Sequence, residues 1–165
     1  DIVHGVFAKA DSRASVPKTC HDIDRVVVDN TKPISNPIAN ALTKIWAFPM
    51  TALGLAYGLL NYPIGARITI GHNAIEFNNV LGGDGAALTL GNSILYARTS
   101  APIPTRLQFG AYGDNYVQTG PHEEGHTWQY QRLGPLFPVA YFLSGGISSR
   151  NPFEQAANLY ARKSP

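Results

Sequence analysis

An uncharged stretch of 22 residues, from Ile45 to Ala66, restricts the fold of this chain more than any other feature. A helix of that length could cross a lipid bilayer. Pro49, Asn61 and Pro63 interrupt the stretch, and a proline removes a helical hydrogen bond and clashes with the preceding turn. The uninterrupted apolar helix is therefore predicted to run only from residue 50 to 60, which is too short to span a membrane. We expect this helix to be buried or to lie on a membrane surface, and a true membrane span is the alternative.

Apolar and polar side chains alternate after this stretch, up to about residue 97. Ile68 and Ile70 have polar neighbours, and Ile75 and Phe77 flank Glu76, which is the two-residue period of a half-buried strand. Turn signals rich in glycine and asparagine separate the apolar runs at residues 71–73, 82–85 and 91–92. We predict an antiparallel meander of three or four short strands, followed by a loop over residues 101–120.

Residues 1–40 are polar and are divided by three prolines, with one short β-like run at residues 25–28. We predict an irregular N-terminal arm over residues 1–40 and one compact domain over residues 41–165, because 165 residues suit a single domain. The net charge of +2 is too small to indicate a nucleic-acid partner. The single cysteine, Cys20, excludes an intrachain disulfide.

Helical signals return at Thr119. Thr119 or Gly120 is expected to cap this helix, Pro121 fits its first turn, and a Gly-Pro pair at residues 134–135 ends it. A short helix is expected at residues 138–143. A last helix is expected to start at Asn151 and to run to about Arg162.

The helix that starts near Thr119 carries the sequence HEEGH at residues 122–126. Residues four apart share a helical face, so His122 and His126 can direct two imidazole nitrogens at one metal ion. Glu123 points to one side of that pair, where it can act as a general base on a water molecule. The alternative is an exposed polar helix start with two solvated histidines.

A catalytic zinc ion needs a third protein ligand and one open position. No histidine follows His126, so the third ligand must come from a distant part of the chain. Glu154 at the start of the last helix is the expected ligand, and its alternative role is a capping-box residue for Asn151. Asp114 and His72 are the further candidates. The sequence thus predicts Zn²⁺ as cofactor, held by His122, His126 and Glu154.

A hydrolase that forms a tetrahedral intermediate also needs a hydrogen-bond donor for the oxyanion. Tyr160, Tyr141 or Arg162 could supply it, and the sequence does not choose among them. Tyr160 is our working candidate for this catalytic role, beside Glu123 as the base.

HEEGH followed by a distant glutamate in the context N-P-F-E-x-x-A resembles the gluzincin branch of the zincin metallopeptidases. The longer string HEEGHTWQYQRLGPLFPVAYFLSGG with NPFEQAANLYA is similar to small bacterial HExxH domains, over about residues 48–161. The resemblance implies a minimal zincin-like α+β fold, in which an antiparallel meander packs on the HExxH helix and on a C-terminal helix that bears the glutamate. It also implies a zincin-like metallohydrolase domain over residues 41–165, with His122, His126 and Glu154 as zinc ligands and Glu123 as base.

The activity implied by this resemblance is hydrolysis of an amide bond in a peptide or protein substrate. An edge strand in zincins pairs with the extended substrate, and residues 88–90 or 93–96 would take that place. Domains of this kind occur alone or at the ends of secreted or toxin-like bacterial chains. This implies a larger parent chain or a cognate inhibitor as partner, and favours a secreted, delivered or periplasmic location over the cytoplasm.

Three alternatives stay open from the sequence. The first is a cell-wall peptide hydrolase or toxin effector that uses the same metal site. The second is a non-catalytic, zinc-stabilised domain that binds a partner. The third is a membrane-associated or membrane-embedded protein that uses the apolar stretch from Ile45 to Ala66.

Overall fold

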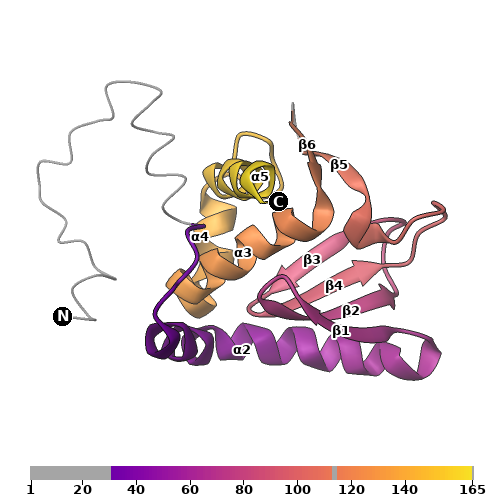
Figure 1. Cartoon of the computed structure of the whole chain (residues 1–165), viewed down its shortest axis with the longest axis horizontal. Coiled ribbons are helices and arrows are strands. Elements are labelled where there is room, and N and C mark those ends of the chain that lie inside the picture. Colours follow the sequence, from indigo (N-terminus) through magenta and orange to yellow (C-terminus); the bar gives the residue numbers. More distant parts are fainter. Residues whose placement is uncertain (1–30, 113–114, 165) are drawn as a thin grey trace, which may run out of the picture.

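The computed structural model describes residues 31–112 and 115–164 of the chain (Figure 1). These residues form a mixed α+β structure with a four-stranded sheet, a separate two-stranded sheet and several helices, which confirms the predicted α+β class. Three features that we discussed from the sequence lie outside the described residues: the expected strand at residues 25–28, Cys20 and the spare ligand candidate Asp114.

The apolar stretch lies in a much longer helix, α2 (Pro37–Asn61). The side chain of Asn36 caps it by accepting hydrogen bonds from the N–H groups of Ile38 and Ala39, both at 3.0 Å. The prediction that Pro49 interrupts the helix is wrong. Pro49 lies on the exposed side, so the hydrogen bond that it cannot make leaves no buried carbonyl without a partner.

The helix also begins at Pro37, inside the stretch that was predicted to be irregular. Among the described residues, no helix is both long enough and apolar enough to cross a membrane.

Small residues bind α2 closely to the rest of the molecule. Ala47, in the first half of the helix, packs against Tyr130 and Phe137, which lie in the helical C-terminal segment of the chain. Gly58, in its second half, lies under the sheet, and a Cβ atom there would be only 2.3 Å from the ring of Phe77. The helix therefore contacts both the sheet and the other helices, as Figure 1 shows, and fixes them relative to each other.

Four strands form the main sheet: β1 (Arg67–Gly71), β2 (Ala74–Val80), β3 (Ala87–Leu90) and β4 (Ser93–Ala97). Their order is β1-β2-β4-β3, and β2 and β4 run parallel. The prediction of an antiparallel meander is therefore wrong at one step, although β1–β2 and β3–β4 are antiparallel hairpins. Burial explains the order, because every residue of β4 is buried and suits the centre, whereas β3 has an exposed Leu88 and lies at the edge.

A second hairpin occupies part of the expected loop. Strands β5 (Phe109–Tyr112) and β6 (Asn115–Gln118) pair antiparallel, and β6 leads directly into helix α3 (Thr119–Leu133). Thr119 does not cap this helix as predicted: its hydroxyl donates to the carbonyl of Gln108 (3.0 Å) and ties the helix start to the residue before β5.

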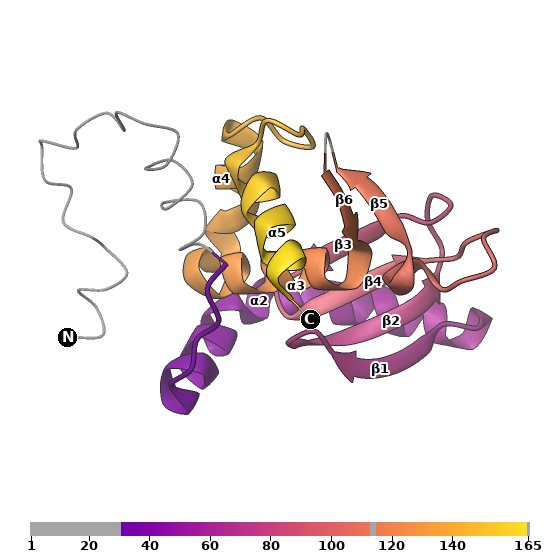
Figure 2. The same ribbon diagram turned by 45° about the horizontal axis from the view of Figure 1, so that its top comes forward.

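Two further helices complete the structure: α4 (Phe137–Leu143) and α5 (Pro152–Lys163). The 3₁₀ turns are η1 (Tyr62–Ile64), η2 (Thr105–Leu107) and η3 (Gly134–Leu136). Helix α5 packs along α3 and contacts β6, and Figure 2 shows α5 and the β5–β6 hairpin side by side.

Candidate metal centre

Helix α3 is polar in sequence and yet almost completely buried. His122 is 1% exposed, His126 is 7% exposed and Glu123 is 5% exposed. These values exclude the alternative of a solvated helix start. Polar side chains inside a protein need hydrogen-bond or ionic partners, so the burial of this helix indicates that the surrounding elements supply them.

Gly125, inside the HEEGH sequence, allows α5 to approach α3 very closely. A Cβ atom at Gly125 would lie 2.9 Å from the Cα atom of Ala157 and 3.2 Å from its Cβ atom. Side chains three residues apart share a helical face, and Glu154 precedes Ala157 by three. The contact at Gly125 therefore places Glu154 opposite the two histidines.

Asn151 fixes the start of α5. Its side-chain oxygen accepts a hydrogen bond from the N–H of Phe153 (3.0 Å), and its Nδ2 donates to the carbonyls of Tyr141 (3.1 Å) and Gly146 (2.7 Å). The N–H of Asn151 itself donates to Ser148, so Glu154 does not close a capping box. The carboxylate of Glu154 is therefore available to the histidines.

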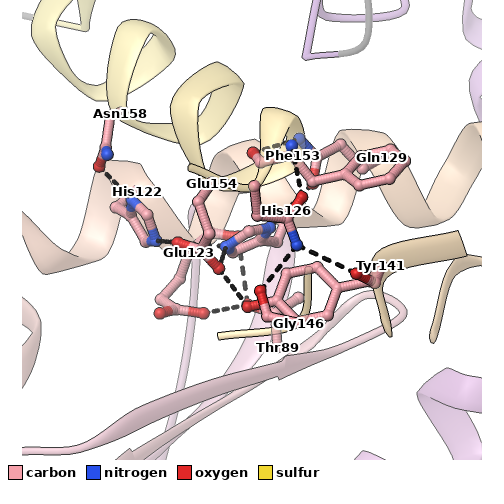
Figure 3. A network of polar contacts seen from close by, with 11 residues as sticks. Thr89, His122, Glu123, His126, Gln129, Tyr141, Gly146, Phe153, Glu154 and Asn158 are labelled. Carbon is pink, nitrogen blue, oxygen red and sulfur yellow. Dashed lines mark hydrogen bonds and ion pairs between the residues drawn. The ribbon is translucent and has the colours of Figure 1, made fainter. Parts of the chain in front are cut away.

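The structure brings His122, His126 and Glu154 together into one group that could hold a metal ion. The Nε2 atoms of the two histidines are 3.2 Å apart. Oε2 of Glu154 lies 3.2 Å from Nε2 of His122, and its Oε1 lies 3.5 Å from Nε2 of His126. All three side chains point toward a common centre in Figure 3.

Two amide side chains determine which nitrogen of each histidine carries the proton. Gln129 donates from Nε2 to the carbonyl of Phe153 (2.9 Å), so its Oε1 accepts from Nδ1 of His126 (2.8 Å). Oδ1 of Asn158 likewise accepts from Nδ1 of His122 (2.9 Å). With both protons on Nδ1, the two Nε2 atoms present lone pairs to the carboxylate of Glu154. Three electron-pair donors thus converge in a buried space, which is the arrangement that a cation stabilises.

The distances also fit a zinc ion. Zinc binds imidazole nitrogen at about 2.0–2.1 Å and carboxylate oxygen at about 2.0–2.2 Å in tetrahedral geometry, so neighbouring ligand atoms lie about 3.3–3.5 Å apart. The two Nε2 atoms are 3.2 Å apart, and the nearer oxygen of Glu154 in each case lies 3.2 Å from that of His122 and 3.5 Å from that of His126. The three side chains could therefore hold the ion without a large rearrangement.

Charge interactions in this group are strong. In the metal-free protein, a second proton on Nε2 lets a histidine donate to Glu154, and a bound cation would take the place of this proton. Burial raises the pKa of Glu154, but these hydrogen bonds from His122 and His126 outweigh burial and hold its pKa well below the usual range. Burial lowers the pKa of His126, and the hydrogen bond to Glu154 outweighs this and raises it. Glu154 is thus an anion at neutral pH, as a metal ligand must be.

Tyr141 lies beside the carboxylate. Its hydroxyl donates a hydrogen bond to Oε1 of Glu154 (2.5 Å), and its ring stands edge-on to that of His126, with centroids 6.3 Å apart. Burial and the contact with Glu154 both raise the pKa of Tyr141, so the hydroxyl keeps its proton and remains a hydrogen-bond donor.

Glu123 points away from the centre of the group and toward β3. The hydroxyl of Thr89 donates to Oε2 of Glu123 (2.6 Å) and lies 3.2 Å from its backbone carbonyl. The group of possible ligands does not include Glu123. Its carboxylate is therefore held next to the site and is not aimed at its centre. The role of Glu123 as a general base stays a prediction.

The working candidate for the oxyanion donor lies elsewhere. Tyr160 accepts a hydrogen bond from Nε1 of Trp128 (3.4 Å). Burial and a hydrogen bond to Glu124 raise the pKa of Tyr160 to about 12. Arg162 is exposed in the last turn of α5. Of the three candidates, Tyr141 is the one that contacts the site.

His72, a spare ligand candidate, belongs to a different polar cluster. Its Nδ1 contacts the fully buried Glu76, which also accepts from Thr69 (2.9 Å) and lies 3.7 Å from the Arg106 guanidinium. Burial raises the pKa of Glu76, but its hydrogen bonds outweigh burial and lower it, whereas the hydrogen bond to Glu76 raises the pKa of His72. This cluster stabilises the sheet rather than the candidate metal centre.

Sequence reasoning did not identify Asn158, Gln129 and Thr89 as parts of the site. Helical spacing offered a signal for two of them: Asn158 follows Glu154 by four residues, and Gln129 follows His126 by three. Thr89 had no such signal, because its contact with Glu123 depends on how the sheet packs against α3.

No protein-family model matches the chain, and neither a curated protein nor a solved structure matches it significantly.

Proposed function

We propose that this protein is a zinc-dependent hydrolase of peptide bonds, with His122, His126 and Glu154 as zinc ligands. One observation carries the proposal: in a buried site the Nε2 atoms of two histidines lie 3.2 Å apart, and each lies 3.2–3.5 Å from one oxygen of the Glu154 carboxylate. Two imidazoles and a carboxylate form the donor set of many catalytic zinc sites.

The number of ligands supports a catalytic role over a structural one. Structural zinc sites are closed by four protein ligands, whereas catalytic sites keep one position open. Among residues 31–112 and 115–164, the group contains three possible ligands and no fourth. Glu123 instead lies at its side, where a base is needed.

A zinc ion in this site would lower the pKa of a water molecule and polarise the carbonyl of the scissile bond. The carboxylate of Glu123 takes the proton from the attacking water and passes it to the leaving amine. Thr89 holds this carboxylate in place through its 2.6 Å hydrogen bond. The hydroxyl of Tyr141, which keeps its proton and donates it to Glu154 here, would turn from that carboxylate to the oxyanion of the tetrahedral intermediate once zinc holds Glu154, and so takes the role first expected for Tyr160.

The position of strand β3 favours a peptide as the substrate. It lies at the edge of the sheet, and none of the described residues pairs with its outer side. The N–H of Ala97 donates to the carbonyl of Ala86 (2.8 Å). Along an antiparallel strand, successive residues direct their backbone N–H and C=O groups alternately toward and away from the partner strand. Leu88 therefore bonds to β4, and the backbone groups of Thr89 point outward. An extended peptide that pairs with this edge would pass beside Glu123. Of the two segments expected for this role, residues 88–90 are at the edge and 93–96 are in the centre.

The variant Glu123→Gln tests the proposal directly. It should bind zinc as the wild type does and lose turnover by about 10²–10⁴-fold, because the amide cannot accept the proton. Glu124→Gln is the matched control, since Glu124 interacts with Tyr160 on another side of α3 and should keep its activity. Full turnover by the zinc-loaded Glu123→Gln variant would refute the mechanism. Parallel assays with an unfolded protein and with peptidoglycan fragments distinguish a general peptidase from a cell-wall hydrolase or toxin effector.

The second candidate is a zinc-stabilised domain without catalytic activity. The burial of the group favours it, because the carboxylate of Glu154 is only 12% exposed and the two histidines are less exposed still. Equimolar zinc in the wild type, with no zinc-dependent turnover of either substrate, would support this candidate instead.

A further inference from the structure

Helix α2 exposes large apolar side chains along the side that faces away from the protein. Its buried residues form a narrow stripe: Ala47, Thr51, Gly54, Gly58 and Asn61. The exposed large apolar residues of the same helix are Ile38, Leu42, Ile45, Trp46, Phe48, Leu53, Tyr57, Leu59 and Leu60. Ile45 is 68% exposed and Leu60 is 76% exposed. A helix that is apolar around its whole circumference is normally buried or in contact with lipid.

This apolar surface continues on both sides of α2. On one side, Ile68 of β1 pairs with Phe77 and therefore shares the sheet face that α2 covers, as does Ile70, which is 88% exposed. On the other side, a groove of about 430 Å³ lies between α2 and β3 and is lined by apolar residues such as Leu53 and Leu88. Figure 1 shows α2 as the outermost layer, with the sheet and α3 both on its inner side. Apolar side chains are therefore exposed on α2 and on the elements at both of its sides.

The charged residues of the segment that contains α2 and β1 are all positive. Residues 31–75 contain no Asp or Glu, but they contain Lys32, Lys44 and Arg67, and all three are exposed. Among the described parts of the chain, no ion pair involves any of these three. An apolar surface with a cationic surround is complementary to an anionic lipid bilayer, whose headgroups attract the cations while side chains enter the acyl boundary.

We propose that α2 docks the protein on the surface of an anionic membrane and lies parallel to the bilayer. With 25 residues α2 is about 37 Å long, and its outward side chains can enter the headgroup region over that length. The buried residues of α2 keep their contacts with the rest of the protein, so the helix binds the membrane without detaching from the sheet and from α3. The proposal is independent of the proposed zinc chemistry.

Flotation of the full chain with lipid vesicles tests this surface. Vesicles of phosphatidylcholine with phosphatidylglycerol should bind the protein, and vesicles of phosphatidylcholine alone should bind it more weakly. Leu60→Gln and Ile45→Gln should each lower the partition coefficient by about tenfold, because each removes one apolar side chain from the acyl boundary. Lys44→Gln should lower it by about fivefold on the anionic vesicles only. Ile147→Gln is the matched control, since Ile147 is 93% exposed in the loop between α4 and α5 and should bind as the wild type does.

Tryptophan fluorescence gives a second measurement. Trp46 is 47% exposed and Trp128 is buried, so a blue shift of the emission on binding reports the transfer of Trp46 to lipid. Failure of the wild type to bind anionic vesicles would overturn the proposal, as would equal losses in Leu60→Gln and Ile147→Gln. A wild-type dimer that dissociates in Leu60→Gln, without vesicle binding, would assign the surface to a second copy of the chain.

Discussion

The close contact between α3 and α5 makes Gly125→Ala the most informative substitution in this structure. The new Cβ atom would lie 2.9 Å from Cα of Ala157 and 3.2 Å from its Cβ, whereas carbon atoms in contact normally lie about 3.5–4.0 Å apart. The two helices must therefore separate by about 0.6–1 Å. Zinc–ligand distances tolerate only about 0.2 Å, so this shift would move Glu154 out of ligand range of the histidines.

The substitution affects both the stability of the fold and the affinity for zinc. Overpacking costs about 1–3 kcal/mol, and the better helix propensity of alanine returns up to about 1 kcal/mol. We expect a net loss of about 1 kcal/mol in the free energy of unfolding, and a Tm lower by about 2–4 °C. The zinc affinity should fall by at least tenfold, because one ligand is displaced.

Thermal unfolding of the metal-free protein and a competitive zinc titration with a chelating dye measure the two effects. Gly83→Ala is the control, because a Cβ atom there would lie 3.7 Å from the Cβ of Ala86, an ordinary contact. If Gly125→Ala gains stability and binds zinc as tightly as the wild type, the reasoning about the α3–α5 contact is refuted.

Three further predictions concern the surroundings of the site. Asn158→Leu removes the acceptor for Nδ1 of His122 and should lower the zinc affinity by about 10–100-fold in the same titration; unchanged affinity would contradict the assigned tautomer. Tyr141→Phe should keep zinc and lower kcat by about 10²–10³-fold, whereas Tyr160→Phe should leave kcat nearly unchanged; the reverse order would restore Tyr160 as the donor. His72→Asn should destabilise the chelator-treated protein most between about pH 4.5 and 6.5. Because the pKa of His72 is raised, its contribution to the stability of the fold is complete below about pH 6.5 and is lost as the pH rises through the folded-state pKa. Because the pKa of Glu76 is lowered, its contribution to stability is complete above about pH 4.5. A Tm difference that does not depend on pH would disprove this coupling.

Local sequence signals predicted the helical half of the molecule well. The HEEGH spacing places two histidines on one helical face, and Asn151 followed by Pro152 marks the start of α5, so the helix that bears Glu154 could be located in advance. That Glu154 reaches the histidines depends on the glycine contact between the helices, which the sequence suggests but does not specify.

Interactions between distant segments were predicted less well. The parallel pairing of β2 with β4 depends on which strand is buried on both faces, and turn signals carry no information about that choice. Pro49 interrupts a helix only if its missing hydrogen bond leaves a buried group unsatisfied, and here it lies on the exposed side. Tyr160 and Tyr141 are equally plausible donors in the sequence, and only the packing of α4 against α3 separates them.

Zinc titration of the metal-free chain, with wild type and His126→Ala compared side by side, tests whether His122, His126 and Glu154 hold a metal ion. We expect one tightly bound zinc ion per wild-type chain and the loss of that ion in His126→Ala, because Nε2 of His126 lies 3.2 Å from Nε2 of His122 and 3.5 Å from Oε1 of Glu154. Tight equimolar zinc binding by His126→Ala would contradict a site built from His122, His126 and Glu154.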